Sequence, residues 1–165
     1  MKTTFLGQEV ALSGEMPAVG SMAPDFEGVR GDLSTFRLSQ LRGKRVVLNI
    51  FPSMDTEVCA ASVRRFNKEA SSLSNTVVLC ISKDLPFAQS RFCSVEGLEN
   101  VVALSMFRSS ELETAYGFGI ESLPMTGLLA RAVVVVDEEG RIVYEELVPE
   151  IAQEPNYEAA LAALK

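Results

Sequence analysis

Four short runs of branched apolar residues constrain the fold of this 165-residue chain more than any other feature. Each run has the length of a β-strand. The apolar residues are continuous rather than alternating, so both faces of each strand must be covered by other parts of the chain. A central sheet with helices on its faces is therefore expected. The runs are RVVLNIF (45–51), NTVVLCIS (75–82), VVALS (101–105) and RAVVVVD (131–137).

The segments between these runs carry helical patterns. After Cys59, residues Val63, Phe66 and Ala70 recur at helical spacing, and most of the charged residues lie off that stripe. This pattern predicts a helix from Cys59 to about residue 72. Further helices are expected at residues 86–93 and 109–116 and in EPNYEAALAALK, where Asn156 is the expected N-cap.

Two hairpins complete the predicted order of elements. Residues 3–12 resemble two short strands around Gly7-Gln8, and VVVVDEEGRIVYEEL resembles strand, tight turn and strand. The last two strands should therefore pair antiparallel. The order as a whole predicts an α/β protein with a mixed central sheet, formed by a single domain over residues 1–165.

Composition excludes several classes of function. The net charge is −7 and the Lys and Arg residues are scattered, which argues against a surface for nucleic acid or anionic membranes. Charges and glycines interrupt the N-terminal segment, and no stretch approaches the ~18 apolar residues of a membrane helix. We expect a cytoplasmic protein with no membrane or nucleic-acid partner.

The cysteine pattern narrows the chemistry. Cys59, Cys80 and Cys93 form no C-x-x-C pair, and the chain contains no histidine. A structural zinc site needs four Cys or His ligands, so no metal site is expected. In a reducing compartment, an odd number of cysteines indicates either redox-active thiols or ordinary buried ones.

Cys59 lies where its thiol could be activated. In FPSMDTEVC a strand ends near Phe51, and Asp55 or Thr56 can cap the helix that follows. With Thr56 as the N-cap, Cys59 is the third helical residue, among backbone N–H groups that favour a thiolate. A nearby cation would help, and Arg131, at the start of an apolar strand, is the candidate. The alternative is that Cys59 is simply a small buried helix residue.

Beyond this local pattern, the sequence resembles the peroxiredoxin family. PSMDTEVC fits the pattern P-x-x-x-T-x-x-C of that family. The longer runs LNIFPSMDTEVCAASVRRFN, VVLCISKDLPFAQSRFC and GLLARAVVVVD are similar to the bacterial, atypical two-cysteine thiol peroxidases of the family. The resemblance covers nearly the whole chain.

The resemblance implies a thioredoxin-like fold with an N-terminal β-hairpin, and reduction of hydroperoxides with no metal or organic cofactor. It implies that Cys59 is the peroxidatic cysteine and Cys93 the resolving cysteine that forms a disulfide with it. It also implies that Thr56 hydrogen-bonds the thiolate and the peroxide, that Pro52 shields the pocket, and that Arg131 stabilises the thiolate and polarises the peroxide. Thioredoxin as reductant and a homodimer are implied in the same way.

Helix geometry adds a prediction about Cys93. If a helix begins at Pro86, Cys93 lies about 10 Å along it, at about 1.5 Å per residue. A disulfide needs Cα atoms roughly 4.4 to 6.8 Å apart. We therefore expect residues 86–97 and the first turn at Cys59 to unwind locally in each catalytic cycle. Cys80, inside VVLCIS, is interpreted as a buried structural thiol.

The apolar residues near Cys59 bear on the substrate. Phe51, Pro52, Met54 and Phe92 favour an organic hydroperoxide over hydrogen peroxide. No role is assigned to Met54 beyond this, although a thioether beside a peroxide pocket is itself oxidisable.

Three other functions share parts of this sequence pattern. A non-enzymatic redox sensor with the same cysteine pair would share every motif, and only turnover distinguishes it from an enzyme. A thiol-disulfide oxidoreductase normally has C-x-x-C, but position 62 is Ser. The spacing from Cys59 to Arg65 matches a tyrosine-phosphatase loop, but VCAASVRR lacks the glycines and the preceding His of that loop.

Overall fold

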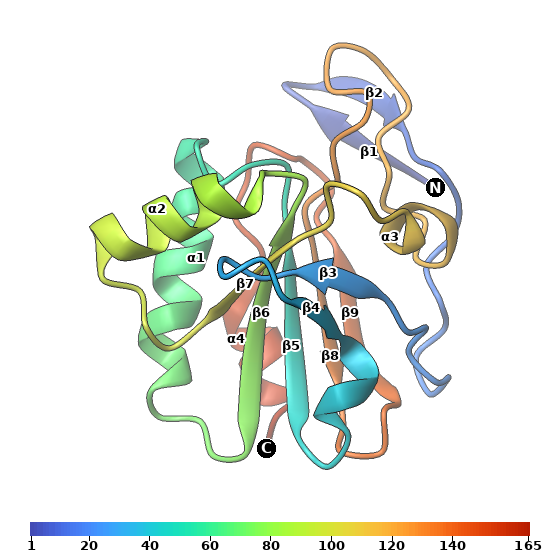
Figure 1. Ribbon diagram of the computed structural model, residues 1–165. Coiled ribbons are helices and arrows are strands. Elements are labelled where there is room, and N and C mark those ends of the chain that lie inside the picture. The colour runs from blue at the N-terminus through green and yellow to red at the C-terminus, as the bar shows by residue number, and fades with distance from the viewer.

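The computed structural model describes all residues from 1 to 165. Its main feature is a seven-stranded sheet in the order β4-β3-β7-β6-β5-β8-β9, and β1 and β2 form a separate two-stranded sheet (Figure 1). The strands are β1 (Lys2–Phe5), β2 (Gln8–Ala11), β3 (Glu27–Val29), β4 (Thr35–Arg37), β5 (Arg45–Ile50), β6 (Thr76–Ser82), β7 (Val102–Ser105), β8 (Ala132–Val136) and β9 (Ile142–Leu147).

Three α-helices and one 3₁₀ turn lie between strands, and a fourth α-helix follows the last strand. They are α1 (Glu57–Ala70), α2 (Pro86–Glu96), α3 (Glu111–Thr114), α4 (Tyr157–Ala162) and the 3₁₀ turn Leu38–Leu41. The expected cap of α4 is confirmed, since Oδ1 of Asn156 accepts a hydrogen bond of 3.0 Å from the amide of Ala159. None of the helices has both the length and the apolar character needed to cross a membrane.

The sheet is mixed, as predicted. Strands β5, β6 and β7 run parallel, whereas β8 pairs antiparallel with both β5 and β9. Because β5 and β6 are parallel neighbours, the loops that follow them leave from the same edge of the sheet and lead into α1 and α2 (Figure 1). In α/β folds this carboxyl edge is where sites form.

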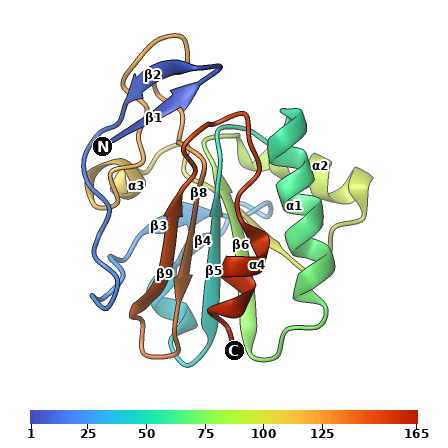
Figure 2. The ribbon, with the colours of Figure 1, turned by 180° about the vertical axis from the view of Figure 1, so that it is seen from behind.

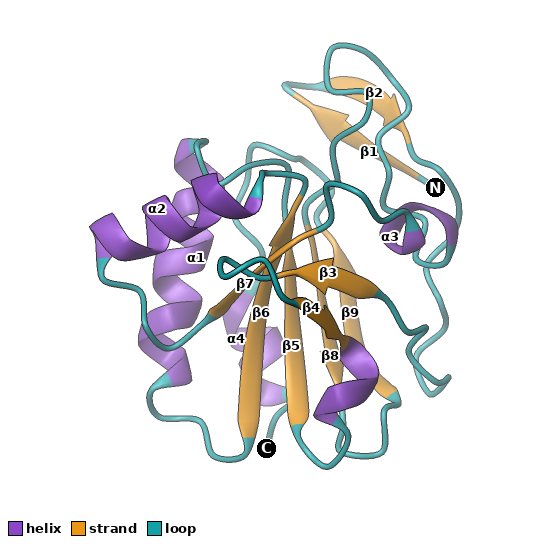
Figure 3. Ribbon diagram, viewed as in Figure 1, coloured by secondary structure: helices purple, strands orange, loops and turns teal.

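The continuous apolar runs reflect a sheet that is covered on both faces. Helices α1 and α4 lie against one face, where Val63, Phe66 and Tyr157 pack with residues of β5, β6 and β8 (Figures 2 and 3). The other face packs against Phe26, Tyr116 and further residues of a second apolar cluster. All five residues of β8 are buried, which explains why no polar residue interrupts that run.

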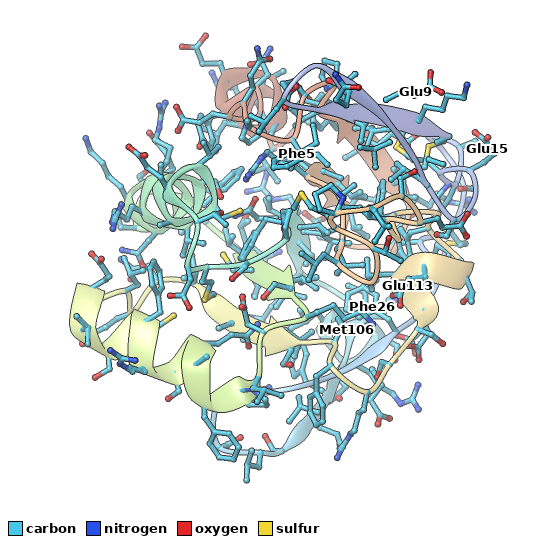
Figure 4. The ribbon with its side chains drawn as sticks, turned by 90° about the horizontal axis from the view of Figure 1, so that it is seen from above. Phe5, Glu9, Glu15, Phe26, Met106 and Glu113 are labelled. Carbon is cyan, nitrogen blue, oxygen red and sulfur yellow. The ribbon has the colours of Figure 1, made fainter.

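The β3–β4 hairpin was not predicted from the sequence. Its strands have three residues each, and β3 contains Gly28, so neither carries an apolar run long enough to be recognised. Gly28 has a packing reason: a Cβ there would collide with the side chain of Leu104, which is fully buried. Viewed from above, Phe26 and Met106 lie close together inside the molecule, whereas Glu9 and Glu15 lie at its edge (Figure 4).

The N-terminal hairpin is confirmed, with its turn one residue earlier than predicted. Leu6 and Gly7 both have positive φ, +51° and +81°, as a two-residue hairpin turn requires. The hairpin is held to the segment after β9, because the amide of Thr4 donates to the carbonyl of Pro149 over 3.1 Å. That segment also contributes to the site described next.

Candidate active site

Cys59 occupies the position predicted for it. Thr56 is the N-cap of α1 with extended backbone angles, φ −97° and ψ 148°, and Cys59 is the third helical residue. The Thr56 carbonyl accepts the first helical hydrogen bond, from Ala60, at 2.9 Å. The side chain of Cys59 points into the apolar cluster between α1 and the sheet and has no solvent exposure. Its sulfur is therefore shielded from water at the N-terminus of a helix.

Arg131 lies directly against this sulfur. Its Nη2 donates to Sγ of Cys59 over 3.0 Å, and its Nε donates to the carbonyl of Ile151 over 2.7 Å. Ile151 belongs to the segment between β9 and α4, so that segment fixes the orientation of the guanidinium. Arg131 is only 2% exposed, and its Nη1 is buried with no hydrogen-bond partner. The guanidinium thus places a fixed positive charge beside the sulfur, and its Nη1 has no acceptor.

Thr56 and Pro52 lie in the loop between β5 and α1, close in sequence to Cys59. Pro52 is buried next to Phe51, where β5 ends. The hydroxyl of Thr56 is on the exposed side of the loop and donates to the carbonyl of Ser53 over 3.0 Å. In this arrangement the hydroxyl does not bond the thiol, so contact with the thiolate or a peroxide requires rotation of the Thr56 side chain.

Cys93 lies in α2, which begins at Pro86 as anticipated and ends at the left-handed Gly97, φ +67°. Both Cys93 and Cys59 are free thiols. The half-buried Cys93 packs against the same apolar cluster that contains Cys59, and burial raises the pKa of its thiol. The structure thus describes the reduced protein, with both helices intact.

Cys80 is a buried structural thiol, as expected. It is fully buried on β6, and this burial raises the pKa of the Cys80 thiol to about 12. Its nearest polar partner is Nδ2 of Asn49, 3.8 Å from the sulfur. The thiol therefore stays protonated and unreactive at neutral pH.

One residue of the site was missed by the sequence analysis. Asp84, in the loop between β6 and α2, accepts hydrogen bonds from Oγ of Ser53 at 2.7 Å, the amide of Met54 at 2.8 Å and Oγ of Ser82 at 2.6 Å. The available signal was the polar run SKD directly after a buried strand, at the edge where α/β proteins form sites.

The surroundings of Cys59 are apolar on the side of the sheet. Phe51 and Met54 are buried in the same cluster as Cys59, and Phe92 packs against it. A groove of about 150 Å³ lies between Asp55, in the loop before α1, and α2. It is lined by Asp55, Ala88, Arg91, Phe92, Val95 and Glu96.

Comparison with known proteins identifies the family of the chain. The family model "Redoxin" matches residues 18–161. A thiol peroxidase of Corynebacterium glutamicum is 56% identical over 163 residues, covering 99% of this chain and 98% of the relative. A thiol peroxidase of Mycobacterium tuberculosis is 59% identical over 161 residues, covering 98% and 96%.

Solved structures confirm the predicted thioredoxin-like fold. A peroxiredoxin-like protein from Aquifex aeolicus superposes with a TM-score of 0.94 at 36% identity, covering 99% of this chain and 95% of that one. A thiol peroxidase from Chromobacterium violaceum shares the fold, with a TM-score of 0.91 at 19% identity, over 99% and 95% of the two chains. By sequence along nearly its whole length and by its fold, the chain belongs to the redoxin family and, within that family, to the thiol peroxidases.

Proposed function

We propose that this thiol-dependent peroxidase reduces hydroperoxides through Cys59, forms an intramolecular Cys59–Cys93 disulfide, and is returned to the reduced form by thioredoxin. The observation that carries the proposal is the 3.0 Å hydrogen bond from Arg131 to the Cys59 sulfur, made inside the protein at a helix N-terminus. This arrangement provides a nucleophilic sulfur and a fixed positive charge at one point.

In the first step the Cys59 thiolate attacks the terminal oxygen of the hydroperoxide. The O–O bond breaks and its electron pair leaves with the alkoxide or hydroxide, which takes a proton from solvent, while Cys59 is oxidised to a sulfenic acid. Nη1 of Arg131 has no partner in the reduced protein and can donate to the oxygen on which charge develops. Thr56, after rotation of its hydroxyl, adds a second donor, and Pro52 shields the reacting atoms from water.

In the second step Cys93 resolves the sulfenic acid. Its sulfur attacks the sulfur of Cys59, a disulfide forms, and the hydroxyl group leaves as water with the proton of the Cys93 thiol. Cys93 lies well inside an intact α2 and Cys59 in the first turn of α1, so residues 86–97 and that turn unwind for the two sulfurs to meet. A dithiol reductant, thioredoxin, then reduces the disulfide and is itself oxidised.

The environment of Cys59 supports organic hydroperoxides as substrates in addition to hydrogen peroxide. Phe51 and Met54 belong to the apolar cluster that contains Cys59, and Phe92 packs against it, so apolar surface near the sulfur favours a substrate with an apolar group next to its O–O bond. Reduction by thioredoxin also fits a cytoplasmic location, where the redox balance keeps free cysteines reduced.

We also propose that the protein is a homodimer. The interface would involve the loops near Cys59 and the region of residues 108–118, beside which Phe107 is 42% exposed. Sedimentation velocity at micromolar concentration tests this, and a single monomeric species would contradict it.

The function is tested by following hydroperoxide consumption with thioredoxin, thioredoxin reductase and NADPH. We expect continuous turnover by the wild type, none by Cys59→Ser, loss of thioredoxin-dependent turnover by Cys93→Ser, and near-normal turnover by the matched control Cys80→Ser. A wild type that consumes one equivalent and then stops, whatever reductant is supplied, would identify a redox sensor instead of an enzyme.

A further inference from the structure

The carboxylate of Asp84 joins the two loops that lead into the cysteine-bearing helices. It lies in the loop between β6 and α2, half-buried, and both of its oxygens accept hydrogen bonds. Oδ1 accepts from Ser53, and Oδ2 accepts from the amide of Met54, so two of its three donors belong to the loop before α1. Hydrogen bonds to a charged carboxylate are among the stronger ones in proteins.

This hydrogen bonding continues to the start of α1. The carbonyl of Ser53 accepts from the amide of Thr56 at 3.3 Å and from its hydroxyl at 3.0 Å. Thr56 is the N-cap of the helix, three residues before Cys59. Asp84 therefore fixes Ser53, and Ser53 fixes the residue at which the first turn of α1 begins.

On the other side the network reaches α2. Oγ of Ser82 donates to Asp84 and accepts from Nε2 of Gln89 at 3.1 Å, and the same Nε2 donates to the carbonyl of Leu104. Gln89 is fully buried although it is polar, and it lies one helical turn before Cys93. The backbone carbonyl of Asp84 also accepts a hydrogen bond, from the hydroxyl of Ser105.

The orientation of Asp84 is unusual for its position. An Asp at the start of a helix commonly caps that helix with its carboxylate. Here the N-cap of α2 is Leu85, which provides no side-chain cap, and Pro86 follows with no N–H to be capped. The Asp84 carboxylate is turned instead toward the loop that precedes the other helix.

We propose that Asp84 is a positioning residue that latches the first turn of α1 to the base of α2. The latch favours the closed form, in which Cys59 is buried against Arg131 and reacts with peroxide. Its release favours the open form, in which both helices unwind locally and Cys59 meets Cys93. This inference rests on the proposed function, because it assigns to one carboxylate the balance between its two chemical steps.

The latch predicts opposite effects on the rates of peroxide reduction and of disulfide formation. In Asp84→Asn at least one of the three donors loses its acceptor, so the closed form becomes less populated. The rate of disulfide formation from the sulfenic acid should rise by about fivefold to tenfold, as expected for the loss of one charge-assisted hydrogen bond. The rate of peroxide reduction should fall, by a smaller factor, because the closed form loses only part of its population. A residue that matters only for general stability would not accelerate either step.

The matched control is Asp137→Asn. Asp137 is also half-buried, and its Oδ1 accepts from the amides of Glu139 and Arg141, both at 2.9 Å, in the turn between β8 and β9. That turn follows the end of β8 remote from Arg131. This variant should leave both rates unchanged.

The two rates are measured separately by rapid quench and mass spectrometry, which distinguishes thiol, sulfenic acid and disulfide. Ser53→Ala, a milder change, should show the same pair of opposite effects. The double variant of Ser53→Ala with Asp84→Asn should differ little from Asp84→Asn alone. Equal rates in wild type and Asp84→Asn would overturn the latch, and so would a uniform slowing of both steps.

A readout that needs no peroxide keeps this test separate from the proposed function. In the reduced protein, Asp84→Asn should speed amide hydrogen exchange in residues 53–59 and 86–93 together, by about fivefold or more, the factor that one lost charge-assisted hydrogen bond produces. Asp137→Asn should not. Faster exchange in only one of the segments, or in neither, would overturn the proposal whether or not the protein turns over hydroperoxide.

Discussion

Arg131 and Cys59 are 72 positions apart in the chain, yet Nη2 of the arginine lies 3.0 Å from the sulfur of the cysteine. The pairing of β5 with β8 brings them together, because Ile50 at the end of β5 lies opposite Ala132, the residue after Arg131. The chain leaves β5 toward Cys59 at the point where β8 begins. Cation and nucleophile are thus placed by one antiparallel strand pair.

Arg131→Lys should slow the reduction of hydroperoxide by about 100- to 1,000-fold, the range found when a fixed donor at a reacting oxygen is lost. Lysine keeps the positive charge, but its single nitrogen cannot occupy the separate positions from which Nε bonds the Ile151 carbonyl, Nη2 bonds the sulfur and Nη1 offers a further donor. Stopped-flow competition for peroxide measures the rate. Arg141→Lys, an exposed residue of the β8–β9 turn, is the control, and an unchanged rate in Arg131→Lys would remove Arg131 from the mechanism.

Thr56→Val should slow the same step, whereas Thr56→Ser should retain most of the rate. The hydroxyl bonds the Ser53 carbonyl in the reduced protein, so it must rotate to serve the peroxide, and serine can rotate in the same way. Because this side chain does not cap α1, the cost to the free energy of unfolding should stay below about 1 kcal/mol. If all three proteins reduce peroxide equally fast, the hydroxyl has no part in the reaction.

Local unwinding of α2 should become easier as pH rises above about 8.5, the ordinary pKa of a thiol. Burial raises the pKa of Cys93 in the closed form, so this form holds the proton more tightly than the unwound one. The resulting stabilisation of the closed form is complete below the ordinary pKa and is lost as pH increases. In the wild type, amide hydrogen exchange in residues 86–96, corrected for intrinsic rates, should become faster above this pH. In Cys93→Ser this acceleration should be absent. If it remains, a group other than Cys93 causes it.

Gly28→Ala should reduce the free energy of unfolding by about 1–3 kcal/mol, the usual cost of overpacking a core. The added methyl group would meet the buried side chain of Leu104, which cannot move into solvent. Urea denaturation measures the change. Gly14→Ala, where a Cβ has an ordinary 3.5 Å contact with Gly117, should cost little, and an equal loss in both variants would contradict this account of Gly28.

Much of the fold could be read from the sequence because the central strands are buried on both faces. β8 is apolar throughout, β5 and β6 are largely apolar, and α1 carries a clear helical stripe. The strands β3 and β4 escaped recognition because their stability comes from pairing with β7 and with each other, not from a local pattern. β7 is distant from β3 in the sequence, and β4 is joined to β3 by a short turn.

The positions in the site and the contact of Arg131 with Cys59 were predictable, whereas the contacts of Thr56 and Asp84 were not. The place of Cys59 in the first turn of α1 follows from local capping, and Arg131 was conspicuous as a cation at the start of an apolar strand. The bond of the Thr56 hydroxyl to Ser53 depends on the side-chain rotamer, which sequence does not specify. The contact of Asp84 with Ser53 joins loops 31 residues apart and matches no motif.

The complete burial of Cys59 makes the reduced protein a size filter for its own reactants. A small hydroperoxide can pass through slight movements of the loop before α1, whereas a folded dithiol protein cannot approach a sulfur with no exposed surface. In the proposed cycle such a reductant gains access only after oxidation has brought Cys59 and Cys93 together outside their helices. Oxidant and reductant then act on two different conformations of the chain, one after the other.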